Sequence, residues 1–244
     1  MEHPVRYQSF FSLLVMSFAI QLLAVGCSKE QPYYKAPVIP VDTSLRAKTY
    51  LALGDSYTIG QSVSAEQRFP YFAVRQLIDN NVEMAQAQII ATTGWTTGNL
   101  LSALSATPPT KTYDFVTLLI GVNNQYQGRS TDEYRVQFTE LLNKAVAYAG
   151  LRRTRVFVLS IPDYSVTPFA AGSDTARIAR EIDTFNAINK EITLQAGVAY
   201  IDITPISRQA RNDATLTASD GLHPSGKQYE KWALLLSPLM RAAL

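Results

Sequence analysis

The chain has 244 residues, 47% of them hydrophobic and 17% charged, which is the composition of a globular protein that can bury a substantial core. At this length we expect one folded domain. The formal net charge of +2, with Lys and Arg dispersed along the chain, argues against nucleic acid or an anionic membrane surface as the main partner.

The N-terminal segment, residues 1–26, has the features of a secretory signal peptide. A single arginine precedes an apolar run at 10–26, which ends in small residues. A transmembrane anchor is the alternative. Two serines and a glutamine interrupt the run, however, and it is short for a bilayer that needs about 20 apolar residues. We therefore predict that this segment directs export.

Cys27 is the only cysteine of the chain, and LAVGC at 23–27 resembles the bacterial lipobox, whose cysteine is lipidated and begins the mature protein. The resemblance implies a lipid anchor on the bacterial cell envelope, at the outer membrane and facing the periplasm or the surface. The SKE that follows is similar to the export signal of Bacteroidetes surface lipoproteins. Residues 27–47 combine three prolines with charges of both signs and no periodic pattern, which predicts a flexible tether before a domain at 48–244.

From residue 48 onward, short apolar runs alternate with longer amphipathic segments. This alternation predicts an α/β fold of three layers, in which helices cover both faces of a flavodoxin-like, five-stranded parallel sheet. The predicted strands are Thr49–Leu53, Gln88–Thr92, Phe115–Gly121, Arg155–Ile161 and Val198–Ile203.

Two long helices are predicted with their ends. Ser130 and Glu133 form a capping box before an apolar stripe, and Gly150 is placed to end that helix. A second long helix spans about 173–196 and stops at Gly197. Shorter helices are predicted over Phe69–Ile78, over Thr97–Ala106 and from Gly226 to the C-terminus.

Ligands bind beyond the carboxyl ends of the strands in an open parallel sheet, so the loops there hold the candidate residues. These loops read GDSYTIG, TGWTTGN, GVNNQYQ and PDYSVTPF after the first four strands. Each is richer in glycine, asparagine, serine or aromatic residues than a turn requires.

Histidine is scarce, and this limits the possible chemistry. The chain has two histidines, and His3 lies in the predicted signal peptide, so His223 is the only imidazole of the mature protein. A serine needs a general base to become a nucleophile. Asp220, three residues earlier, can accept from Nδ1 and leave Nε2 to face a hydroxyl. The alternative is a loop histidine beside a turn-forming aspartate.

Four segments together resemble a known family. GDSYTIG at 54–60, the glycine of TTGWTT at 92–97, GVNNQ at 121–125 and DGLHPS at 220–225 are similar, in order and spacing, to the four blocks of the SGNH subgroup of GDSL hydrolases. The similarity runs from Tyr50 to the C-terminus. It implies the SGNH hydrolase fold and no cofactor.

The resemblance also implies a catalytic role for each block. Ser56 would be the nucleophile, His223 the general base and then acid, and Asp220 the residue that orients it. The backbone N–H groups of Ser56 and Gly94 and the side-chain amide of Asn123 would form the oxyanion hole. Preorganised donors of this kind stabilise the charge that develops on an ester oxygen during attack.

Asparagine replaces the aspartate that the family commonly has after Asn123. Because that aspartate is a loop organiser, Asn124 puts the geometry of the loop in question more than the chemistry.

Other acidic residues have simpler interpretations. Asp163 is an alternative orienting acid, although a turn or N-cap is favoured there. Asp55 is expected to bond the backbone of the strand-to-helix turn, and Asp202 to be buried and paired at a strand end. A metal held by Asp220 and His223 is disfavoured, because no second mature histidine or free thiol is available, so we expect no metal.

Five aromatic residues fall in or beside these loops and are candidates for a substrate pocket, with ordinary loop packing as the alternative. They are Tyr57, Trp95, Tyr126, Tyr164 and Phe169. No inserted lid is visible, and an open cleft suits a small acyl group, such as acetate on a carbohydrate or a short aryl or alkyl ester.

The function predicted is therefore a serine esterase that acts through an acyl-enzyme on a small-molecule or glycan ester. The alternatives are a lysophospholipase or thioesterase-type acyl hydrolase, an acyltransferase, and a catalytically silent glycan-binding lipoprotein. We expect a monomer that contacts the membrane through its lipid only and does not bind nucleic acid.

Overall fold

The computed structural model describes residues 47–244, which lie within one compact unit of the chain. The predicted signal peptide, the lipidation of Cys27 and nearly all of the predicted tether lie outside the described residues. No helix within 47–244 is both long enough and apolar enough to cross a lipid bilayer.

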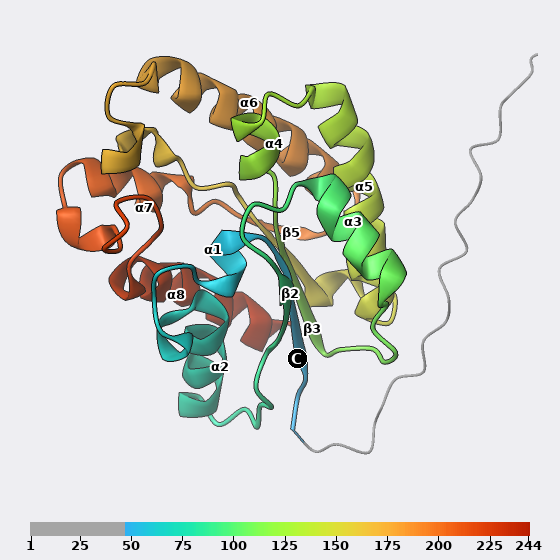
Figure 1. The fold of residues 1–244 in the computed structure, drawn as a ribbon. Coiled ribbons are helices and arrows are strands. Elements are labelled where there is room, and N and C mark those ends of the chain that lie inside the picture. The colour runs from blue at the N-terminus through green and yellow to red at the C-terminus, as the bar shows by residue number, and fades with distance from the viewer. Residues whose placement is uncertain (1–46) are drawn as a thin grey trace, which may run out of the picture. The chain divides into compact units, whose positions relative to one another are not determined.

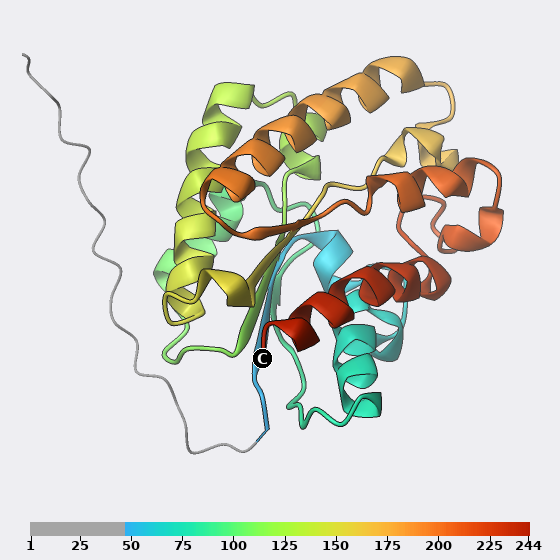
Figure 2. The ribbon, with the colours of Figure 1, turned by 180° about the vertical axis from the view of Figure 1, so that it is seen from behind.

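A five-stranded parallel sheet lies between two layers of helices, which confirms the predicted α/β fold (Figures 1 and 2). The strands are β1 (Tyr50–Gly54), β2 (Gln88–Ala91), β3 (Phe115–Leu119), β4 (Val156–Leu159) and β5 (Ala199–Ile201). Their order in the sheet is β2-β1-β3-β4-β5, so β1 pairs with β2 on one side and with β3 on the other.

The inner strands are apolar at nearly every position because both faces of the sheet are covered. Every residue of β1, β3 and β4 is buried, whereas β2 at the edge is only partly buried. Several predicted strands run past the ends of the observed ones. Ile120 and Ile161 are as buried as strand residues, so the apolar pattern continues into loops where the backbone has left the sheet.

Helices cover both faces of the sheet (Figures 1 and 2). On one face α2 (Phe69–Asp79) packs against α8 (Gly226–Ala242). On the other, α5 (Thr131–Tyr148) packs against both α3 (Thr97–Ala106) and α6 (Thr175–Gln195). All five correspond to predicted helices.

The ends of the long helices follow the predicted signals, with one exception. The Ser130 hydroxyl oxygen accepts a hydrogen bond from the N–H of Glu133 at 3.1 Å. The Glu133 carboxylate does not complete the capping box; it accepts from Gln137 Nε2 at 3.0 Å instead. Gly150 and Gly197 follow α5 and α6 with φ of 64° and 67°, a left-handed conformation that glycine adopts readily.

The end of β1 lies very close to β3. A Cβ added at Gly54 would be 2.1 Å from Thr58 Oγ1 and 2.4 Å from the carbonyl oxygen of Leu119, so only glycine fits there. The short helix α1 (Ser56–Ile59) starts two residues later and is therefore held against the carboxyl edge of the sheet. This is the edge at which open parallel sheets bind ligands.

Candidate active site

Ser56 is the first residue of α1 and follows the inner strand β1 after a single residue. Asp55, the residue between, caps the helix as predicted, because its Oδ1 accepts the N–H of Tyr57 at 3.0 Å. Only 4% of the Ser56 surface is exposed. The strand-to-helix turn thus fixes the serine at the edge of the sheet while leaving little of it in contact with bulk water.

The loop before α8 brings Asp220 and His223 together. Asp220 Oδ2 lies 2.6 Å from His223 Nδ1, and Oδ1 accepts the backbone N–H groups of Leu222 and His223 at 2.9 and 3.0 Å. The three-residue spacing therefore closes the loop on the carboxylate and fixes the orientation of the imidazole. With Nδ1 engaged, Nε2 is the nitrogen left to accept a proton from a hydroxyl.

Hydrogen bonds keep the Asp220 carboxyl ionised. Partial burial opposes ionisation, but donors from the Ser62 hydroxyl, the Leu222 N–H and His223 together hold the pKa of Asp220 well below its usual range. A charged carboxylate at Nδ1 stabilises the imidazolium that forms when His223 takes up a proton. This is the electrostatic requirement of a general base acting on serine.

Ser56, His223, Gly94 and Asn123 line one cavity of about 150 Å³. Apart from Thr93, the remaining lining residues have apolar or aromatic side chains; they are Tyr57, Val122, Tyr126, Tyr164, Phe169 and Leu222. The loops after β1, β2, β3 and β4 and the loop before α8 all contribute. The structure thus assembles in one place the residues that the four sequence blocks single out.

Two groups in the cavity are suited to bind a negatively charged oxygen. Gly94 has φ of 83°, and no acceptor among the described residues takes its N–H. The Asn123 amide donates to the carbonyl oxygen of Trp95 at 2.9 Å. The side-chain amide carries two N–H groups. The bond to Trp95 uses one and orients the Asn123 side chain, and the second N–H remains available to a ligand.

Asn124 holds together the two loops that carry these donors. It is fully buried, its Oδ1 accepts the N–H of Thr97 at 2.9 Å, and its Nδ2 donates to Thr97 Oγ1 at 2.7 Å. The loop after β3 is thereby tied to the first turn of α3. Asparagine supplies the amide donor that an ionised aspartate would lack, so the loop keeps a defined geometry with this residue.

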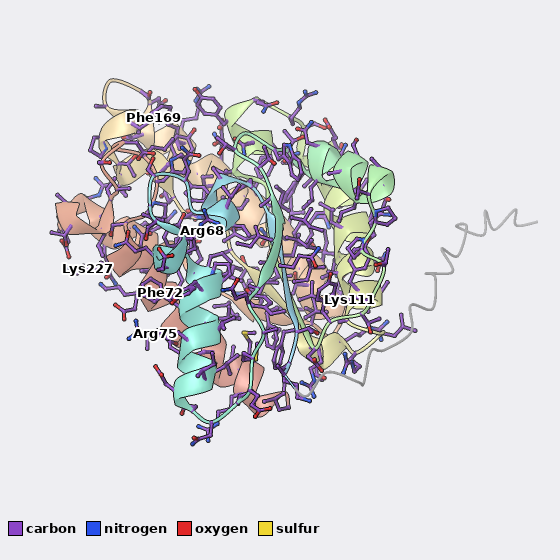
Figure 3. All side chains as sticks on the ribbon, turned by 60° about the horizontal axis from the view of Figure 1, so that its bottom comes forward. Arg68, Phe72, Arg75, Lys111, Phe169 and Lys227 are labelled. Carbon is purple, nitrogen blue, oxygen red and sulfur yellow. The ribbon has the colours of Figure 1, made fainter. Side chains whose placement is uncertain are left out.

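Four of the five predicted aromatic residues line the cavity, and Trp95 does not. Tyr126, Tyr164 and Phe169 form a cluster at one wall of the cavity, with ring centroids 6.1 to 6.3 Å apart. Tyr57 packs edge-on against His223 with centroids 5.5 Å apart. Trp95 lies outside the cavity lining and instead lines a hollow beside β2, although its backbone carbonyl fixes Asn123. Figure 3 shows Phe169 at the outside of the molecule.

Asp163 is occupied elsewhere. Its Oδ1 accepts the N–H of Ser165 at 2.8 Å, as an N-cap does, and its Oδ2 accepts from Arg208 at 2.8 Å. Asp202 accepts from Ser160 at 3.1 Å, so it is paired as expected, but it is exposed rather than buried. Asp220 is therefore the carboxylate that contacts the imidazole.

Sequence reasoning missed three cavity residues and one contact. Thr93, Val122 and Leu222 line the cavity, and each directly precedes a predicted site residue, which is the signal that identifies them. The contact of Ser62 with Asp220 has no such signal, because the two residues are 158 positions apart.

Asp55 is a buried acid with an incomplete set of partners. Burial raises its pKa to about 7, against the lowering effect of the N–H groups of Tyr57 and of Asp55 itself. Its Oδ2 is buried and has no hydrogen-bond partner among the described residues. Folding therefore favours the protonated form of this side chain.

Comparison with known proteins gives a family match. The model of the GDSL-like lipase/acylhydrolase family matches residues 52–231. No curated protein sequence gives a significant match.

Solved structures with related folds are distant in sequence. TesA is 18% identical and has a TM-score of 0.61, covering 81% of this chain and 100% of its own. An acetyl xylan esterase from Geobacillus stearothermophilus is 17% identical, with a TM-score of 0.60 and coverages of 80% and 97%. The esterase EstA from Pseudoalteromonas sp., in a structure inhibited by monoethylphosphonate, is 16% identical, with a TM-score of 0.58 and the same coverages. At these identities the likeness shows a shared fold.

The substitution Asp55→Asn should flatten the dependence of stability on pH. The folded-state pKa of about 7 exceeds the ordinary aspartate pKa of 3.8, so the stabilisation of the protonated form is fully present below about pH 4 and is lost as the pH rises through 7. The wild-type free energy of unfolding should fall there by up to about 1.4 kcal/mol per pH unit. Urea unfolding at several pH values measures this. Asp79→Asn, on the exposed end of α2, is the control and should keep the wild-type dependence on pH. If the free energy of unfolding changed with pH equally in Asp55→Asn and in the wild type, the prediction would be contradicted.

The substitution Asn123→Ala should lower kcat for a short ester by about 10²–10³, because it removes one donor to the charged oxygen. Gln127→Ala is the matched control: its amide reaches the Gly94 carbonyl at 3.4 Å from an exposed position, and its loss should change kcat by less than about threefold. Steady-state kinetics with p-nitrophenyl acetate provide the comparison. An Asn123→Ala enzyme as active as the control would remove this residue from the oxyanion hole.

Proposed function

Because the chain belongs to the GDSL-like lipase/acylhydrolase family and is therefore a hydrolase of ester bonds, we propose that it is a serine esterase specific for small acyl groups. The observation that carries the proposal is that Ser56 shares a small, mostly apolar cavity with an imidazole held by an ionised carboxylate. Carbohydrate O-acetyl groups and short aryl or alkyl esters are the substrate class.

The reaction would begin with proton transfer from Ser56 Oγ to His223 Nε2 as Oγ attacks the ester carbonyl. The carbonyl oxygen becomes negatively charged. It accepts hydrogen bonds from the backbone N–H groups of Ser56 and Gly94 and from the second amide N–H of Asn123. His223 then returns its proton to the leaving alcohol, and the acyl group stays on Oγ. Water, deprotonated by His223, completes the cycle by attacking this acyl-enzyme.

The size and the lining of the cavity support a small acyl group. A volume of about 150 Å³ surrounded by Val122, Leu222 and tyrosine rings matches the size of an acetyl or butyryl chain better than that of a long fatty acid. Long-chain lysophospholipids and acyl thioesters are for that reason the less favoured substrates.

The cavity rim supports a flat leaving group. Tyr126 is 60% and Phe169 47% exposed, so each presents a large apolar surface to an entering molecule. Aromatic rings of this kind stack on sugar or aryl rings. The acetyl xylan esterase with this fold is consistent with a carbohydrate ester as the substrate of this chain.

The test is a panel of p-nitrophenyl esters, acetylated glycans, lysolipids and acyl-CoAs with the wild type and with Ser56→Ala. We expect kcat/KM to be highest from acetyl to butyryl, to fall at least about tenfold by decanoyl as the chain outgrows the cavity, and to be lost in Ser56→Ala. Ser102→Ala, on the exposed face of α3, is the matched serine control and should be unchanged.

A fluorophosphonate probe separates the alternatives in the same samples. Labelling of the wild type but not of Ser56→Ala is expected, because only an activated serine reacts. A wild type that is neither labelled nor active would favour the glycan-binding alternative. Products carrying the acyl group on an added sugar acceptor would indicate an acyltransferase, and highest activity on lysolipids or acyl-CoAs would overturn the small-acyl assignment.

We propose further that the protein is exported and anchored to the cell envelope by a lipid on Cys27, on the strength of the LAVGC pattern. In a bacterial host grown with a labelled fatty acid, the wild type should carry the label and sediment with membranes. Cys27→Ser should do neither, and Ser28→Ala is the adjacent control. Label on Cys27→Ser would contradict the assignment.

A further inference from the structure

Ser62 has an uncommon backbone conformation. Its φ is 66°, in the left-handed region that few residues other than glycine adopt. Such a conformation costs free energy and persists only where the surroundings impose it. Ser62 is an exposed residue of the loop that follows α1, so its conformation calls for a contact that fixes it.

That contact is with the acid of the proposed triad. The Ser62 hydroxyl donates to Asp220 Oδ2 at 2.6 Å, the same oxygen that lies 2.6 Å from His223 Nδ1. The other oxygen, Oδ1, is already occupied by two backbone N–H groups. Ser62 therefore completes the set of donors around the carboxylate, and does so from the segment that carries the nucleophile.

The neighbouring residue makes a second contact from the same turn. Gln61 Oε1 accepts from the hydroxyl of Thr93 at 2.7 Å, and Thr93 precedes Gly94. Two consecutive side chains after α1 thus reach two different loops of the cavity, one carrying an oxyanion donor and the other the triad acid. The turn holds three parts of the site in register.

We propose that Ser62 is a positioning residue for ester hydrolysis, holding Asp220 in line with His223 and drawing negative charge from the oxygen that faces the imidazole. The inference rests on the esterase function proposed above. Ser62 does not line the cavity, so it acts through Asp220 and not on the substrate.

Removing the hydroxyl has two predicted consequences. The carboxylate becomes freer to rotate, which lowers kcat. Its Oδ2 also carries more charge, which stabilises the imidazolium and moves the acid limb of the pH profile to higher pH. KM should stay within about twofold, because the binding surface is unchanged.

The other titratable groups packed around Asp220 and His223 do not obscure the shift of the acid limb. Burial raises the pKa values of the Tyr57, Tyr164 and Tyr229 phenols, so they stay neutral where imidazole titrates. Asp55 titrates in that range, but it contributes equally to the wild type and the variant. Asp163, Arg68 and the exposed Tyr126 also lie near the pair, and they too are the same in the wild type and the variant.

The test compares Ser62→Gly, Ser62→Ala and the wild type. Glycine removes the hydroxyl and accommodates the positive φ, so this variant should unfold at the same temperature as the wild type or higher. Alanine removes the hydroxyl and keeps the Cβ. Ser64→Gly, in the same exposed loop and without a contact to Asp220, is the control and should keep kcat within about twofold.

For both Ser62 variants we expect a fall in kcat of about tenfold on p-nitrophenyl acetate, and an acid limb displaced upward by a few tenths of a pH unit. Full activity in Ser62→Gly would overturn the proposal. So would a loss of kcat with an unmoved acid limb, since that result indicates a purely structural role. If the wild type itself neither cleaves esters nor reacts with a fluorophosphonate, the esterase proposal fails first; an active wild type with an equally active Ser62→Gly refutes the role of Ser62 alone.

Discussion

The hydrogen bond between Asp220 Oδ2 and His223 Nδ1, at 2.6 Å, is the interaction on which the site depends. The chain past the predicted signal has one imidazole, so no other histidine is available for the general-base role that we propose for His223. The surrounding contacts keep the pair in place: two backbone N–H groups close the loop on Oδ1, and a hydroxyl from the loop after α1 holds Oδ2. The fold brings this pair to the one edge of the sheet where Ser56 emerges.

That edge exists because the strands are parallel and β1 is an inner strand, between β2 and β3. Parallel strands end together, so the loops after β1, β2, β3 and β4 meet around one cavity. Gly54 lets the β1 turn approach β3 closely, and Asn124 ties the β3 loop to α3. The proposed oxyanion donors, the serine and the imidazole are therefore held by packed and hydrogen-bonded loops, as electrostatic preorganisation requires.

Much of this arrangement could be predicted from the sequence, because the signals are local. Runs of β-branched and apolar residues mark all five strands, and Gly150 and Gly197 mark where helices end. Asp220 and His223 are close in sequence, so a short loop suffices to pair them. What could not be predicted depends on contacts between distant segments. Ser62 reaches Asp220 from a distant loop, and Trp95 lines the hollow beside β2 and not the cavity. Asn124 takes the place of aspartate through its hydrogen bonds to Thr97.

The most direct test of the account is to trap the acyl-enzyme. The protein is mixed with p-nitrophenyl acetate, quenched in acid during turnover, and analysed by intact mass and by peptide mapping. An acetyl group on the peptide that contains Ser56, absent from His223→Ala treated in the same way, is the predicted result. Ester cleavage with no adduct on Ser56, or with the adduct on another residue, would contradict the account.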